Sequence, residues 1–193
     1  MLILVVIVAV AIALMRGGRI GNLSNLPLRK IGWFILAFLM QILLRLLSGR
    51  GVLIVKYGPL IHIISYVFII IGLWYNWKIR EIKIIDVGIL LNLIVIVANG
   101  GRMPVLINTP NLKSISLSEL AALANGRNPI HSLYNKSTRL GFLSDIFSLP
   151  AFFPYPVIFS IGDLILSVGV FILIQRIMLA PKVRYLPIRR LKR

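Results

Sequence analysis

The stretch FSIGDLILSVGVFILI, residues 159–174, places an aspartate, Asp163, inside a run that is otherwise almost entirely apolar. Such a run supplies most of a membrane-crossing helix, which needs about 20 apolar residues. An ionisable side chain at membrane depth is costly, so it is normally paired, hydrated in a cavity or functional. The stretch therefore indicates a membrane helix and singles out Asp163 as a candidate functional residue.

The composition of the chain indicates an integral membrane protein. Of its 193 residues, 59% are hydrophobic, and the mean hydropathy is +0.94, which is too apolar for a soluble domain. The absence of cysteine excludes disulfides, thiolate metal sites and cysteine nucleophiles, and two histidines leave little for a metal site. We therefore expect neither a metal nor a cofactor.

The net charge of +17 identifies the expected partners. The 22 basic residues are scattered between apolar segments instead of lining one soluble face. This distribution favours anionic lipid headgroups over nucleic acid as the counter-charge.

Five apolar segments predict an all-α membrane protein with one domain over residues 1–193. The predicted transmembrane helices cover residues 2–15, 31–47, 60–75, 84–98 and 158–179. Residues 99–157 form a long segment between the fourth and fifth helices, and residues 180–193 form a basic tail. No basic residue precedes the first span, which argues for a retained helix and against a cleaved signal peptide.

The basic residues also predict the orientation. Thirteen of them fall on one side of the five spans and seven on the other. The positive-inside rule places the larger group in the cytoplasm. The N-terminus and the long segment are then outside, and the basic tail is a cytoplasmic anchor for anionic lipids.

The long outer segment should have internal structure, because loops above about 15 residues rarely lack it. The sequence from Ser116 to Glu119 fits a capping box, and Gly126 fits a helix stop, so a short helix is expected over residues 117–125. Residues 148–157, with three prolines and three aromatic side chains, predict a rigid strap leading into the last span.

Small and polar residues mark the helix faces that should meet inside the bundle. In the fourth span these are Gly88, Asn92 and Asn99, and in the fifth they are Ser160, Gly162, Asp163, Ser167 and Gly169. Small residues allow close helix contact, and Asn92 is most simply an interhelical hydrogen-bonding group. The structural interpretation of Asp163 is a salt bridge with Arg45 or a hydrogen bond to His62.

Two of the five acidic residues, Asp145 and Asp163, bracket the strap on the outer side, and the strap can bring them together. Two carboxyl groups held close together share one proton, so one can activate water while the other protonates a carbonyl oxygen or a leaving amine. We take Asp145 and Asp163 as candidate catalytic residues. Asn99, Arg139 and His62 are candidate substrate-binding residues.

Two short segments carry a local family resemblance. GFLSDIF, residues 141–147, and FSIGDLILSVG, residues 159–169, resemble the two aspartate segments of signal peptidase II, the bacterial lipoprotein signal peptidase. The resemblance implies that Asp145 and Asp163 form a dyad that cleaves a lipid-modified peptide in the membrane. The chain departs from that family in having Ser160 in place of asparagine, Gly162 in place of alanine and five spans in place of four.

Over its full length the chain resembles a family of small bacterial multi-pass membrane proteins of unknown function. The resemblance rests on RGGRIGNLSNLPLR at 16–29, NGGRMPV at 99–105, TRLGFLSD at 138–145 and FSIGDLILSVGVF at 159–171. It implies a location in the bacterial cytoplasmic membrane and carries no activity.

Two functions remain open at the level of sequence. The first is an aspartyl hydrolase acting on a membrane-bound peptide or lipid-linked substrate. The second is a non-enzymatic membrane subunit or lipid-binding scaffold, in which Asp163 holds the bundle together. A transporter is disfavoured because the chain has no inverted repeat.

Overall fold

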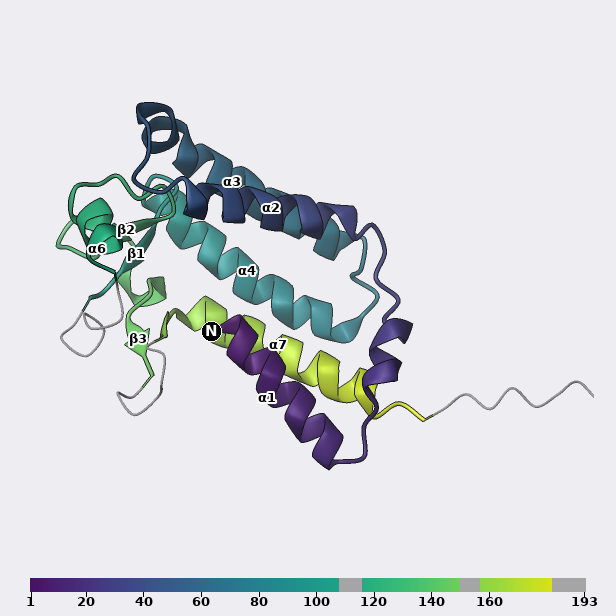
Figure 1. Cartoon of the computed structure of the whole chain (residues 1–193). Helices are drawn as coiled ribbons and strands as arrows, with labels where there is room; N and C mark the ends of the chain where they lie inside the picture. Colours follow the sequence, from purple (N-terminus) through teal and green to yellow (C-terminus); the bar gives the residue numbers. More distant parts are fainter. Residues whose placement is uncertain (108–115, 150–156, 182–193) are drawn as a thin grey trace, which may run out of the picture.

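The computed structural model describes residues 1–107, 116–149 and 157–181, and these are mostly helical (Figure 1). The α-helices are α1 (Leu2–Met15), α2 (Gly32–Leu46), α3 (Val52–Trp74), α4 (Arg80–Ala98), α6 (Leu117–Ala124) and α7 (Ile161–Met178). Two short 3₁₀ helices are η1 (Ile20–Asn25) and η2 (Gly141–Leu143). The strands are β1 (Met103–Val105), β2 (His131–Leu133), β3 (Phe147–Ser148) and β4 (Ile158–Phe159).

Consecutive long helices run in opposite directions. Gln41 of α2 bonds to Ser65 of α3, and Trp33 near the start of α2 packs on Phe68 farther along α3, so this pair is antiparallel. Helix α7 is antiparallel to α4 and runs beside α1. One end of the bundle therefore collects β1 to β4 and α6, and we call it the sheet end (Figure 1). The other end, where α7 finishes, is called the opposite end.

Each predicted span corresponds to a helix, and four of the five helices have shifted boundaries. Helix α1 has the predicted limits, α2 is one residue shorter at each end, and α4 begins four residues early, at Arg80. Helix α7 begins at Ile161 because the two residues predicted to start it pair in β4. Among the described helices, α3 and α7 are long and apolar enough to cross a membrane, whereas α1 and α2 are apolar but shorter.

The predicted start of the third span, at residue 60, is wrong. Helix α3 begins at Val52 and contains Pro59. Proline has no N–H to donate to the carbonyl four residues earlier, which here is that of Val55. The Arg102 guanidinium donates to this carbonyl at 3.3 Å. The freed backbone acceptor is thus satisfied, and the helix continues through the proline.

Glycines let α4 and α7 approach closely. A Cβ atom on Gly88 would meet the backbone of Gly162 and Leu166, and one on Gly162 would meet the side chain of Asn92. A Cβ atom on Gly169 would meet Ile85. These contacts confirm the predicted small-residue faces. The buried apolar core beside them joins α3, α4 and α7, with Leu73, Ile85 and Leu173 among its members.

The outer segment contains the predicted short helix together with unpredicted strands. Helix α6 is capped by Ser116, whose Oγ accepts from the Glu119 backbone N–H at 3.2 Å, and Gly126 follows the helix with a φ of +62°. Strand β1 pairs with β2 in parallel, and β3 pairs with β4 antiparallel, so the all-α prediction misses two small sheets. Most of the predicted strap, residues 150–156, and most of the basic tail, residues 182–193, lie outside the described residues.

Candidate functional site

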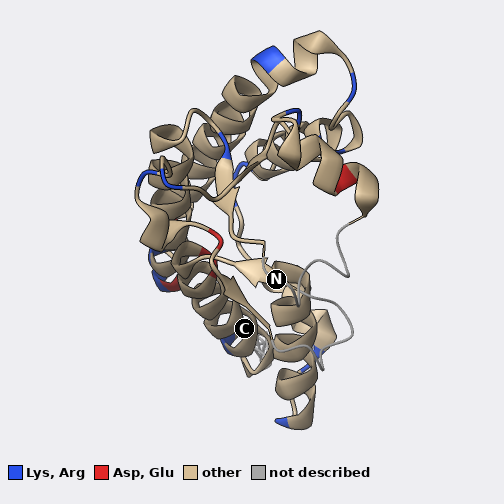
Figure 2. Cartoon of the chain, turned by 90° about the vertical axis from the view of Figure 1, so that its left-hand side faces the viewer, with Lys and Arg blue, Asp and Glu red and all other residues tan. Residues whose placement is uncertain are grey.

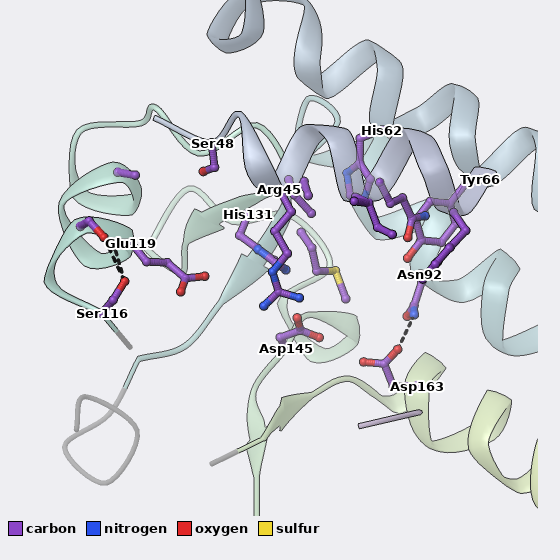
Figure 3. A pocket seen from close by; sticks show the side chains of 17 residues that line it. Arg45, Ser48, His62, Tyr66, Asn92, Ser116, Glu119, His131, Asp145 and Asp163 are labelled. Atoms are coloured by element: carbon purple, nitrogen blue, oxygen red, sulfur yellow. Dashed lines mark hydrogen bonds between the residues drawn. The ribbon is translucent and has the colours of Figure 1, made fainter. Parts of the chain in front are cut away.

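A pocket of about 540 Å³ lies at the sheet end, between the long helices and the outer segment (Figure 3). Its walls come from α2, α3, α4, α6 and α7 and from the segments around β1, β2 and η2. The ionisable side chains that line it are Arg45, His62, Tyr66, Glu119, His131, Asp145 and Asp163. Both aspartates that the sequence identifies therefore face one cavity.

The chain brings the two aspartates together through backbone pairing. The Asp145 backbone N–H donates to the Pro104 carbonyl at 3.0 Å, and the Asp145 carbonyl accepts from Leu106 at 2.9 Å, which attaches this segment to β1. Two residues later, Phe147 pairs with Phe159, and their rings stack. This antiparallel pairing joins the residues after Asp145 to those before Asp163. It explains how positions distant in sequence line one pocket.

Asp145 is a buried carboxyl group with incomplete hydrogen bonding. Its side chain is 8% exposed, and Oδ1 has no hydrogen-bond partner among the described residues. Burial, reinforced by the nearby charge of Asp163, raises the pKa of Asp145 to about 8. A carboxyl group with this pKa is mostly protonated at pH 7, so it can donate a proton.

Asp163 occupies a different environment at the first turn of α7. Its Oδ2 accepts from the Ser160 backbone N–H at 3.2 Å, and Ser160 Oγ accepts from the Asp163 N–H at 3.0 Å, which completes a capping box. The Asn92 side chain donates to Asp163 Oδ1 at 2.9 Å and accepts from Ser160 Oγ at 2.8 Å. Three side chains from α4 and the start of α7 thus form one closed network, and both Asp163 oxygens accept N–H donors.

The structural partners expected for Asp163 were wrong. Neither Arg45 nor His62 bonds to it in the described structure, where Asn92 and Ser160 do. The reason is local: residue 163 is the third residue of α7, so its carboxylate reaches back to the free N–H of the cap. The prediction that Asn92 is an interhelical hydrogen-bonding group is confirmed.

His62 lines the pocket from α3 but is already engaged. Its Nδ1 lies 2.8 Å from the Gly101 carbonyl, and its ring meets Tyr66 edge to face. The side chain is 3% exposed. His62 therefore joins the segment after α4 to α3, and it presents only part of its ring to the cavity.

Asn99 and Arg139 lie outside this pocket. The Asn99 side chain donates to the Arg139 carbonyl and accepts from the Arg139 backbone N–H, both at 2.9 Å. Together they line a second, smaller hollow of about 280 Å³. The structure thus brings these two candidates together, but not with Asp145 and Asp163.

Four other ionisable side chains of the pocket were not identified as site residues from the sequence, namely those of Arg45, Tyr66, Glu119 and His131. Arg45 and Glu119 project into the cavity from α2 and α6, and His131 does so from β2 (Figure 3). Burial lowers the pKa of His131 to about 4, with His62 and Arg45 adding to the shift, so its ring is neutral at pH 7. Phe38, Gln41, Ile42 and Arg45 recur at helical spacing on one face of α2. This pattern is the sequence signal that places Arg45 on the pocket side of the helix. Nothing in the sequence around His131 indicates its position.

Comparison with known proteins places the chain in a family without an assigned activity. The chain belongs to DUF5317, a family of unknown function, whose model matches residues 25–175. The match includes Asp145 and Asp163. No curated protein and no solved structure matches the chain. The expected membership of a family of unknown function is confirmed, whereas the local resemblance to signal peptidase II gains no support.

Proposed function

We propose that this member of DUF5317 is a multi-pass protein of the bacterial cytoplasmic membrane that hydrolyses a membrane-bound peptide or lipid-linked substrate with Asp145 and Asp163. The observation that carries the proposal is that both carboxyl groups line one pocket in unlike environments. Different environments give two carboxyl groups different pKa values, so that one can act as the acid and the other as the base.

Exposed apolar surface supports the membrane location. Ile3 on α1 is 78% exposed, and Phe38 and Leu39 on α2 are each more than half exposed. In the apolar window of α3, only 17% of the residues are buried within the protein. A core helix of a soluble protein would be mostly buried, so these side chains fit a lipid environment better than water.

The proposed topology has α1, α2, α3, α4 and α7 crossing the membrane, with the N-terminus outside. Their alternating directions suit such a path. Figure 2, which views the sheet end, has Lys and Arg on loops and helix ends, with few acidic positions among them. The excess of basic residues at the opposite end favours the cytoplasm for that end, and the basic tail is then available to anionic lipids.

The proposed chemistry uses the proton of Asp145. The carboxylate of Asp163 takes a proton from water while the water oxygen attacks the scissile carbonyl carbon, and Asp145 protonates the carbonyl oxygen. In the second step the new proton on Asp163 passes to the leaving nitrogen. The carbon–nitrogen bond breaks, and Asp145 recovers its proton from the second hydroxyl group. The products are a carboxylic acid and an amine.

Asn99, Arg139 and His62 have supporting roles in this proposal. Asn99 holds the Arg139 backbone just before η2, which leads to Asp145. His62 fixes the residues that lead into β1, on which Asp145 is paired. These contacts keep Asp145 at the pocket without touching the substrate.

The proposal is tested by isotope incorporation. Membranes from cells expressing the protein are incubated in H₂¹⁸O, and new carboxyl groups are detected by mass spectrometry. We expect labelled products with the wild type, and a loss of at least about 100-fold in Asp145→Asn and Asp163→Asn, as for removal of a general acid or base. Asp86→Asn, which changes an acid outside the pocket, is the matched control. Equal labelling in both pocket variants and the wild type would exclude the dyad.

A structural scaffold is the second candidate, and the capping box favours it. Asp163 caps α7 and bonds to α4, so it could serve only to hold the two helices. In that case Asp163→Asn lowers the thermal stability, and Asp145→Asn changes no reaction. The labelling experiment and a melting curve on the same variants separate the two functions.

A further inference from the structure

One face of α2 changes from apolar to cationic along its length. Phe38, Gln41, Ile42 and Arg45 recur at helical spacing, and all four line the pocket. Phe38 is 64% exposed and Ile42 is 37% exposed. The apolar part of this wall is therefore accessible from outside the bundle. Seven residues of helix cover about 10 Å, which separates an apolar section from the charge of Arg45.

The other polar walls supply carboxyl groups. Three of the five acidic residues of the chain, Glu119, Asp145 and Asp163, line this pocket in a protein of net charge +17. Asp145 is more than nine-tenths buried, and its Oδ1 has no hydrogen-bond partner among the described residues. No ion pair is formed by Arg45 or Glu119 within residues 1–107, 116–149 and 157–181. The pocket therefore has a cationic and an anionic position to offer a ligand.

We propose that the pocket binds the head group of a zwitterionic amphiphile that carries a phosphate and a primary ammonium. The phosphate lies at Arg45, the ammonium at Glu119, and the hydrocarbon along Phe38 and Ile42. An anionic lipid lacks a group for Glu119, and a ligand with only an ammonium leaves Arg45 unpaired. A soluble zwitterion makes no use of the exposed apolar wall.

In this arrangement the bound head group shares the pocket with Asp145 and Asp163. The inference concerns binding and goes beyond the proposed hydrolysis, which breaks a carbon–nitrogen bond that such a lipid does not have between its head group and its acyl chains. The binding itself needs no hydrolysis, so it can be measured in Asp145→Asn. Loss of hydrolysis and loss of binding are therefore separate results.

The experiment measures lipid retention by native mass spectrometry. The full-length protein is equilibrated in detergent with equal amounts of phosphatidylethanolamine, phosphatidylglycerol and phosphatidylcholine that have the same acyl chains. We expect one phosphatidylethanolamine to be retained about fivefold over each of the other two, the preference that one additional charge contact gives. An excess of soluble phosphoethanolamine should not displace it. Displacement, or equal retention of the three lipids, would overturn the inference.

Single substitutions test whether Glu119 binds the ammonium and Arg45 binds the phosphate. Glu119→Gln should remove the preference for phosphatidylethanolamine over phosphatidylglycerol while some lipid remains bound. Arg45→Gln should reduce retention of all three lipids about fivefold. Arg50→Gln, an exposed arginine outside the pocket, is the control and should retain lipid like the wild type. If Arg45→Gln and Arg50→Gln retain the same amounts, or if Glu119→Gln keeps the preference, the assignment is wrong.

Discussion

The acidic residues at the two ends of the bundle differ in whether they have an ion-pair partner. At the opposite end, Glu81 is buried and paired with Arg176 at 3.0 Å, which joins α4 to α7. At the sheet end, Glu119, Asp145 and Asp163 share one pocket, and none of them has an ion pair in the described part of the chain. The first arrangement is a structural use of charge. The second leaves three carboxyl groups without a charged partner among the described residues.

The largest effect is expected where helix packing and the pocket meet. Gly162→Ala should lower the free energy of unfolding by about 3 kcal/mol, because its Cβ atom would collide with Asn92 and the Gly88 carbonyl. Unfolding in detergent, followed by circular dichroism, measures the loss. Gly32→Ala, where nothing lies within 4 Å of the new atom, is the matched control. Similar stability of the two variants would contradict the close α4–α7 contact.

A smaller effect is expected in how the free energy of unfolding depends on pH, through the carboxyl group of Asp145. The pKa of Asp145 is about 8 in the folded protein, against an ordinary value near 4, so the folded state binds the additional proton between these pH values. Its contribution to stability is therefore full below about pH 4 and falls as the pH rises towards 8. We expect wild-type stability to decline by about 2 kcal/mol between pH 5 and pH 7 from this group.

The test for this decline is Asp145→Asn, which cannot ionise. The variant should lose most of the dependence on pH in that range, whereas Glu119→Gln should keep it. Melting curves at several pH values provide the measurement. A variant that declines as steeply as the wild type would show that Asp145 does not carry the extra proton.

The smallest effect tests the structural ion pair at the opposite end. Glu81→Gln should cost about 1 kcal/mol, because Arg176 is half exposed and solvent weakens the pair. The same change at Glu119, which has no ion pair among the described residues, should leave the melting temperature unchanged. If both variants lose equal stability, the ion pair of Glu81 contributes nothing that Glu119 lacks.

The helices were predictable from the sequence because their signals are local. Apolar runs identified α1, α2 and α4, and glycine spacing identified the contact between α4 and α7. The extension of α3 was not predictable, because Arg102, which is remote in sequence, compensates for Pro59. The strands were missed because each has only two or three residues and depends on pairing over long distances.

The remaining pocket residues depend on tertiary structure. The sequence identified Asp145 and Asp163 because carboxyl groups are rare in this chain. It did not identify Arg45, Glu119 or His131 as members of the same pocket, since they come from α2, α6 and β2. It also placed Asn99 and Arg139 at the aspartates, whereas their mutual hydrogen bonds hold them at a separate hollow.

The most direct test of the carboxyl pair is an infrared titration of Asp145 in the membrane-reconstituted protein. The carbonyl band of its protonated form is assigned by its absence in Asp145→Asn. We predict that the band titrates near pH 8 in the wild type and at lower pH in Asp163→Asn, because the charge of Asp163 contributes to the shift. A band that is already lost at pH 5, or one that titrates at the same pH in both proteins, would contradict the shared pocket.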